Sequence, residues 1–239
     1  MVNMSFEQKL AQMLELNKGK RIFQFEHQGQ RYWLKQAEKL KGFMRVLKGN
    51  AQKALRREMC ALQRLSRKHA AVPKMVCHDA DFFVLEDSGV TIKDWLSKDI
   101  SQDNMQQILN DSSKALAELH SMGLNHGRPA LRDICWNNGQ VTFIDFESKF
   151  GKSSEEQKKV RDLVLYIHSL YRSLGPQNEI VEQAIQQYRD AGGEWVWLQT
   201  QDFLRSWQWL YYVSFPFRNN GGRDSKPVYW VLRHFRYTV

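Results

Sequence analysis

The sequence has 239 residues, of which 42% are hydrophobic, 26% are charged and only five are prolines. A chain of this length can bury a substantial core and fits one large domain or a two-lobed unit. It lacks the run of roughly 20 apolar residues that a membrane-spanning helix needs, and its first residues lack the apolar core of a signal peptide.

The net charge of +9 favours anionic partners such as nucleotides, nucleic acids or acidic lipids, although solubility alone would also explain it. No Cys/His zinc pattern, basic heptad helix or RNA-binding aromatic signature is present, which disfavours nucleic acid. The three cysteines, Cys60, Cys77 and Cys135, form neither a metal pattern nor a disulfide framework. We therefore predict buried free thiols and a reducing compartment.

The first third of the chain predicts strands and one helix. Residues 21–36 read as a β-hairpin with its turn at residues 28–30, and residues 72–76 begin a further extended region. A helix is expected from about residue 51 to residue 68, with an apolar stripe at helical spacing formed by Leu55, Met59, Leu62 and Leu65. The apolar run 82–85 predicts a buried strand, which Glu86-Asp87-Ser88-Gly89 ends.

From Thr91 onward the pattern becomes mainly helical. Apolar spacing predicts one helix over about 105–119 and another over about 160–170, which Gly175-Pro176 stops. This order predicts an α+β fold in which a single domain, residues 1–239, has a smaller β-rich N-terminal lobe (1–88) and a larger helical C-terminal lobe (89–239).

The most informative segment lies between His126 and Glu147. Asn138-Gly139 is a strong signal for a two-residue hairpin turn, and β-branched and aromatic runs flank it. Asp133 enters this hairpin and Asp145 leaves it, so antiparallel pairing puts both carboxylates at the same end of one ribbon. Two convergent carboxylates predict a site for Mg²⁺.

A second feature is a lysine and a glutamate in the N-terminal part. Glu58 lies on the apolar stripe of its predicted helix, where a carboxylate is costly unless it is paired. Lys35, near the end of a predicted strand, is a natural partner. The alternative is a solvated edge lysine and a glutamate at the margin of the stripe.

These features resemble the protein-kinase-like superfamily. Its catalytic segment reads H-[RG]-D, then an Asn five residues after that Asp, a hairpin and D-F-G or D-F-E. His126, Asp133 and Asp145 fall in the matching places, with Asp133 replacing the Asn. The resemblance implies ATP and Mg²⁺ as cofactors: Asp133 and Asp145 hold the metal, and Lys35, held by Glu58, contacts the phosphates.

The resemblance assigns further roles. The segment with Glu86 and Asp87 would receive adenine through backbone groups. His126 would support the catalytic loop, and Asp162 would anchor that loop by accepting backbone hydrogen bonds. The alternative for Asp162 is an exposed acid in a first helical turn.

Arg128 stands where the family has its catalytic Asp, and a guanidinium cannot accept a proton. Three readings follow. The chain is a pseudokinase that binds nucleotide and a partner; or Asp133 takes part of the base role; or Arg128 stabilises phosphoryl charge while the acceptor oxygen loses its proton late.

Within the superfamily, short pieces such as Leu119-His120, His126-Gly127 and 144–147 most resemble bacterial lipopolysaccharide core (Kdo/heptose) sugar kinases. This resemblance implies an ATP- and Mg²⁺-dependent phosphotransferase acting on an anionic glycolipid or sugar acceptor. It implies a cytoplasmic protein with peripheral contact at the inner membrane. The alternatives are a catalytically impaired regulatory module that binds a nucleotide or a partner, and a basic surface-binding protein.

The C-terminal segment from Trp195 to Val239 mixes aromatic and basic residues. Such a mixture can dock on an anionic membrane surface, or the aromatics can fill the helical core. Residues 215–223 resemble a surface loop and are the best candidate for membrane or substrate contact.

Overall fold

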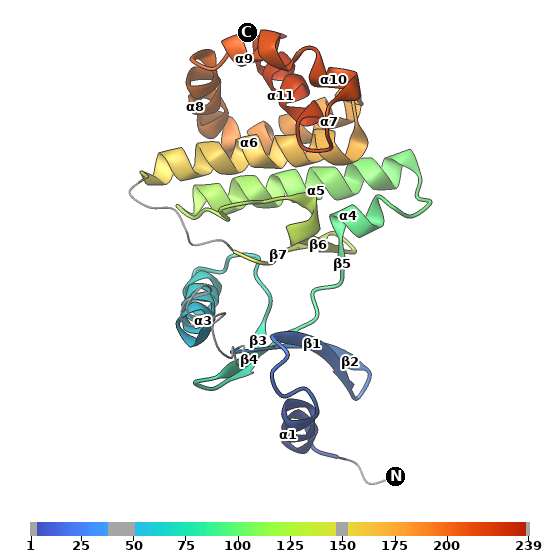
Figure 1. The fold of residues 1–239 in the computed structure, drawn as a ribbon, viewed down its shortest axis with the longest axis vertical. Helices are drawn as coiled ribbons and strands as arrows, with labels where there is room; N and C mark the ends of the chain where they lie inside the picture. Colours follow the sequence, from blue (N-terminus) through green and yellow to red (C-terminus); the bar gives the residue numbers. More distant parts are fainter. Residues whose placement is uncertain (1–3, 38–50, 147–152, 238–239) are drawn as a thin grey trace. The chain divides into compact units, whose positions relative to one another are not determined.

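The computed structural model describes residues 4–37, 51–146 and 153–237. Contacts divide the chain into two compact units, Met1–Ser88 (unit 1) and Gly89–Val239 (unit 2). Figure 1 shows the strands and helices of each unit along the chain.

Unit 1 is built on a four-stranded antiparallel sheet with the strand order β1-β2-β4-β3. Its strands are β1 (Ile22–His27), β2 (Gln30–Gln36), β3 (Met75–His78) and β4 (Phe82–Glu86). The β1–β2 hairpin and β4 lie where the sequence predicts them. Leu34 of β2 pairs with Val84 of β4, and both side chains are fully buried at the centre of the sheet.

Two helices complete the described part of unit 1. Helix α3 (Ala51–Arg67) matches the predicted helix and buries Leu55, Leu62 and Leu65. Helix α1 (Phe6–Leu16) was not predicted, although Ser5 and Gln8 form a capping box at its start. Leu10 of α1 joins Phe25, Leu34 and Val84 in one apolar cluster, so α1 covers the sheet.

Unit 2 begins with a second, three-stranded sheet in the order β5-β6-β7. Its strands are β5 (Val90–Thr91), β6 (Ile134–Asn137) and β7 (Gln140–Phe143). Asn138 and Gly139 both have positive φ, as the predicted hairpin turn requires. A single 3₁₀ turn, η1 (Leu131–Asp133), leads into β6.

Helices make up most of the remaining described part of unit 2. They are α4 (Ile92–Trp95), α5 (Gln102–Ser121), α6 (Glu155–Leu174), α7 (Asn178–Tyr188), α8 (Glu194–Arg205), α9 (Trp209–Ser214), α10 (Phe217–Asn220) and α11 (Lys226–Tyr237). Within this unit the β6–β7 hairpin contacts α5, whereas α8 and α11 pack on α6 (Figure 1). A π-helical turn, η2 (Arg189–Gly193), joins α7 to α8. Gly193 is required there because a Cβ atom would overlap the Tyr188 ring.

The predicted fold class is confirmed: the chain is α+β, with a small sheet-based N-terminal part and a larger, mainly helical C-terminal part. No helix in the described residues is long and apolar enough to cross a membrane. The prediction of buried thiols is right for Cys135 and wrong for Cys60, which is exposed. Cys60 lies on α3 outside the stripe of Leu55, Leu62 and Leu65, so it faces solvent.

The C-terminal aromatics divide between the two predicted environments. Trp197, Tyr229 and Phe235 are buried in the helical core, and the Trp197 and Phe235 rings stack with centroids 4.3 Å apart. Other rings are exposed on the same helices and their connections, namely Trp207, Trp209, Tyr212, Phe215 and Phe217. The core interpretation is therefore confirmed for the buried rings, whereas membrane docking of the exposed rings stays a prediction.

Candidate active site

The loop that carries Arg128 is anchored by a buried aspartate. Asp162, fully buried on α6, accepts hydrogen bonds from the backbone N–H groups of His126 (2.5 Å) and Gly127 (2.8 Å). Gly127 has φ = 100°, a conformation that favours glycine. Charge-assisted bonds to two successive amides fix the direction of the loop, so Asp162 does what the sequence predicts of it.

His126 ties this loop to the end of the hairpin. Its Nδ1 accepts the Arg128 backbone N–H at 3.2 Å, and its Nε2 lies 2.9 Å from the Ile144 carbonyl oxygen. A neutral imidazole with its proton on Nε2 satisfies both contacts, and burial lowers the pKa of His126, which favours this neutral form. The ring also packs against Phe146, with centroids 4.6 Å apart. His126 therefore supports the loop.

Arg128 extends from the anchored loop toward both predicted metal ligands. Its Nε lies 3.6 Å from Asp133 Oδ2, and its Nη2 lies 3.5 Å from Asp145 Oδ2. One guanidinium thus bridges two carboxylates that are twelve positions apart in the sequence. The hairpin brings the carboxylates together, and the cation between them keeps their repulsion low.

The two carboxylates differ in environment. The side chain of Asp133 is 9% exposed, and burial raises its pKa, although Arg128 and Arg132 partly oppose this shift. The side chain of Asp145 is 53% exposed. Asp145 has φ = 60°, which aspartate tolerates better than most residues. The Ile144 N–H donates to the Asp133 carbonyl at 2.9 Å, which fixes the two ends of the hairpin relative to each other.

The chemistry of this pair fits a Mg²⁺–nucleotide site. Mg²⁺ in such sites is held by one or two carboxylates together with substrate phosphates, and Asp133 and Asp145 already converge on one cation, the Arg128 guanidinium. Within the described part of the chain, no group of three or more His, Cys, Asp or Glu side chains is arranged to hold a metal ion.

Unit 1 contains the predicted lysine–glutamate ion pair. Lys35 Nζ on β2 donates to Glu58 Oε1 on α3, and about one fifth of each side chain is exposed. Lys35 is directed by this contact, and the Glu58 charge on the inner side of α3 is neutralised.

Glu86 and Asp87 make contacts within unit 1. Glu86 pairs with Lys74 at 2.7 Å, and Asp87 accepts the Trp33 Nε1–H at 2.9 Å. The backbone N–H of Glu86 donates to Lys74, and that of Asp87 donates to Arg31. Neither N–H can donate to a ligand without breaking these bonds.

Sequence reasoning missed the buried contacts that His120 makes with Asp162 and Tyr188. His120, at the end of α5, lies with Nε2 3.5 Å from Asp162 Oδ2 and Nδ1 2.7 Å from the Tyr188 hydroxyl oxygen. All three side chains are buried, and burial lowers the pKa of His120. The Leu119-His120 pair stood out in the sequence, but no sequence signal pointed to Tyr188, which is 68 positions away from His120.

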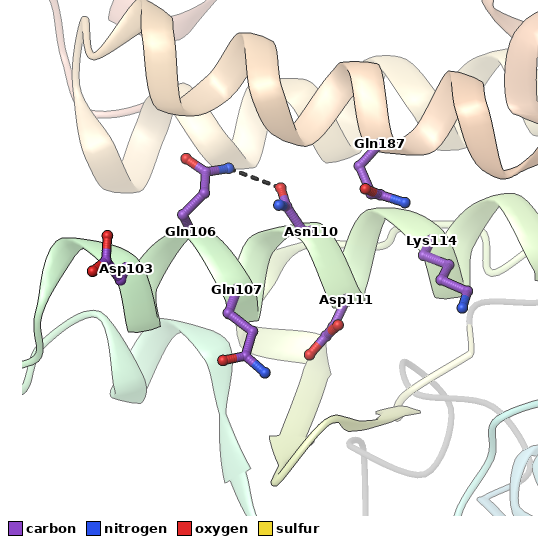
Figure 2. Close-up of a pocket in the computed structure, with 7 residues that line it drawn as sticks. All are labelled: Asp103, Gln106, Gln107, Asn110, Asp111, Lys114 and Gln187. Carbon is purple, nitrogen blue, oxygen red and sulfur yellow. Dashed lines mark hydrogen bonds between the residues drawn. The ribbon is translucent and has the colours of Figure 1, made fainter.

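A polar pocket of about 520 Å³ runs along α5 (Figure 2). Its lining contains none of the predicted site residues and consists of Asp103, Gln106, Gln107, Asn110, Asp111, Lys114 and Gln187. Several of these groups are already bonded: Gln106 donates to Asn110 at 2.8 Å, and Asp111 accepts the Trp136 Nε1–H at 2.8 Å. This pocket therefore takes no part in the site described above.

The fold and these contacts define a protein-kinase-like protein. A strand lysine paired with a helix glutamate, an anchored loop and a hairpin that ends in an aspartate are the parts that this class uses. The chain belongs to the lipopolysaccharide kinase (Kdo/WaaP) family, whose model matches residues 4–191. The resemblance predicted from the sequence is thus confirmed.

The chain is also similar to a protein of Haemophilus influenzae that is described as uncharacterized. The two are 34% identical over 236 residues, which cover 98% of each chain. The similarity therefore extends through the C-terminal segment that lies beyond the family match.

Proposed function

We propose that this chain is an ATP- and Mg²⁺-dependent phosphotransferase that phosphorylates a sugar hydroxyl of a lipopolysaccharide-type glycolipid. Membership of the lipopolysaccharide kinase family supports the reaction class. The observation that carries the finer proposal is the convergence of Asp133 and Asp145 on a single cation.

In this proposal the predicted site residues have separate roles. Asp133 and Asp145 in unit 2 hold Mg²⁺, which when bound neutralises charge on the ATP phosphates. In unit 1, Lys35 contacts the phosphates and Glu58 directs it. Asp162 and His126 are positioning residues, because their buried hydrogen bonds hold the loop on which Arg128 lies.

Arg128 is assigned a role that differs from the family's aspartate. Its side chain is 33% exposed and its ion pairs with Asp133 and Asp145 are long, so it can turn from these carboxylates toward the phosphoryl oxygens when nucleotide is present. A guanidinium there stabilises the charge of the transferring group. The acceptor hydroxyl loses its proton late, because phosphoryl transfer depends mainly on positioning and electrostatics.

The acceptor and the location are parts of the same proposal. A net charge of +9 suits an anionic glycolipid. The relevant acceptors would be lipid-linked sugars at the cytoplasmic face of the inner membrane, and the backbone carbonyls of Glu86 and Asp87 would contact the adenine of ATP.

A second function is favoured by one specific observation. Arg128 neutralises part of the charge on both carboxylates, and no carboxylate stands at its position to act as a base. These features suit a pseudokinase that binds nucleotide and regulates a partner. The two functions differ in whether phosphate is transferred.

The test combines nucleotide binding with transfer. Thermal unfolding with ATP, with and without Mg²⁺, is measured for the native chain, for Asp145→Ala and for a control, Asp103→Ala, which removes an acid from the first turn of α5. ATP at about 100 times its dissociation constant raises the free energy of unfolding by roughly 2.7 kcal/mol. We expect a Mg²⁺-dependent rise in melting temperature that the Asp145 variant loses and the Asp103 variant keeps.

Transfer is then measured from labelled ATP to extracted lipopolysaccharide core. Labelled core that depends on Asp145 supports the phosphotransferase. A nucleotide-dependent shift without labelled product supports the pseudokinase. No shift at millimolar ATP contradicts both functions.

A further inference from the structure

A second pocket, of about 500 Å³, lies in unit 2 at the C-terminal end of α6 and has a basic lining. It is formed by Tyr171, Arg172, Gly175, Pro176, Arg218, Asn219, Arg223, Lys226, Pro227 and Trp230. Asp162, which anchors the catalytic loop, is ten residues earlier on the same helix, so about 15 Å of helix rise separates the two places. Most of the lining lies beyond residue 191, where the family match ends.

The charge of this pocket is not balanced. Four of its lining residues are cations, and the carboxylate beside them is Asp224, which pairs with Arg172 at 3.1 Å. Among the residues that the structure describes, Arg223 and Lys226 have no ion-pair partner. Cations that share one concave site without counter-charges attract an anion, and arginine binds phosphate oxygens in a fork of N–H donors.

An apolar rim adjoins the cations. The Arg218 guanidinium lies 3.6 Å from the centroid of the exposed Phe215 ring. Phe215 contacts Tyr229 (5.8 Å), which contacts Trp230 of the pocket (5.1 Å). Nine of the fourteen exposed large hydrophobic side chains in the described residues fall between Trp195 and Phe217. Of these side chains, Phe215 is tied to the pocket by its contacts with Arg218 and Tyr229, so the cations have an exposed aromatic ring beside them.

We propose that this pocket binds the phosphate headgroup of an anionic membrane lipid, with Phe215 and the exposed aromatic side chains of α9 and α10 resting in the bilayer interface. Trp and Tyr favour that boundary, and basic residues beside them are drawn to anionic lipid. The pocket is bounded by Gly175, Pro176 and Pro227 at helix ends, and its volume suits one headgroup rather than a nucleic-acid strand. This site is independent of the proposed phosphotransfer.

The experiment is co-sedimentation of the full chain with vesicles of phosphatidylcholine, with and without phosphatidylglycerol. The pocket variant is Arg223→Glu with Lys226→Glu. The matched control is Lys93→Glu with Lys98→Glu, which makes the same change in net charge on α4 and in the segment after it, outside the pocket lining. Circular dichroism and thermal unfolding establish that both variants fold.

We expect binding to the anionic vesicles that the pocket variant weakens about tenfold or more, and that the control weakens much less. Phe217→Ser should also weaken it, because it removes an exposed aromatic side chain from α10. Equal loss in both double variants would show unspecific charge attraction and overturn the proposal. So would the absence of vesicle binding, whether or not inorganic phosphate or a single-stranded oligonucleotide binds instead.

Discussion

By the resemblance, Arg128 stands where the protein-kinase-like pattern has its catalytic aspartate, and Arg128→Gln tests what it does. Glutamine keeps a polar side chain on the anchored loop and removes the charge. In the proposed site, Mg²⁺ would have to displace the Arg128 guanidinium from Asp133 and Asp145 in the native chain. In the Arg128→Gln variant there is no guanidinium to displace, so we expect Mg²⁺ to promote ATP binding at a lower Mg²⁺ concentration.

The size of the effect follows from the geometry. The two N···O distances are 3.6 and 3.5 Å, which are ion-pair contacts rather than close hydrogen bonds. Partly exposed pairs of this kind contribute roughly 0.2–1 kcal/mol each. About 0.5 kcal/mol for each gives about 1 kcal/mol together, which corresponds to a roughly fivefold change in the Mg²⁺ midpoint.

The assay is a Mg²⁺ titration of ATP binding, followed by calorimetry or thermal shift, with phosphate transfer measured on the same proteins. Arg132→Gln is the matched control, because Arg132 contacts Asp133 at 3.5 Å and its described ion pairs do not include Asp145. We expect a fivefold lower midpoint in Arg128→Gln, a smaller change in Arg132→Gln, and a loss of transfer on the order of 10³ when Arg128 is removed.

Two results would refute this reasoning. An unchanged Mg²⁺ midpoint in Arg128→Gln would show that the guanidinium does not compete for the cation position. Faster transfer in that variant would show that Arg128 impairs the reaction rather than stabilising phosphoryl charge.

The remaining predictions concern buried groups. Asp162→Asn leaves one of two buried N–H donors poorly satisfied, which costs about 3 kcal/mol of folding stability and lowers the melting temperature by roughly 6–12 °C. The control Asp103→Asn changes the melting temperature little. Equal melting temperatures of the two variants would contradict the anchoring role of Asp162. His234 provides a pH test, because burial and the nearby Arg189 charge lower its pKa from 6.5 to about 4. The unfolded chain therefore binds more protons between these values, and the free energy of unfolding falls as pH drops from 6.5 toward 4. In His234→Leu this slope is shallower in urea titrations, and an unchanged slope rules out the histidine as its source.

Local patterns were enough to predict several parts of this protein. The hairpin at Asn138-Gly139 followed from turn chemistry, since those residues accept the positive φ that the turn needs. Its two flanking aspartates then had to lie at one end of the ribbon. The α3 stripe and the Lys35–Glu58 pair followed from helical and strand periodicity and from the cost of an unpaired buried carboxylate.

Other features depend on residues that are distant in the sequence. The contact of Tyr188 with His120 arises only when α7 packs on α5, and the bridge from Arg128 to Asp145 arises only when the loop is fixed by Asp162 on α6. The basic pocket joins Arg172 to Lys226 across 54 positions. The sequence by itself determined the local elements and the order of the chemical groups, because these depend on near neighbours. Tertiary packing alone decided which charges meet and which aromatic rings remain exposed, because those outcomes depend on long-range contacts.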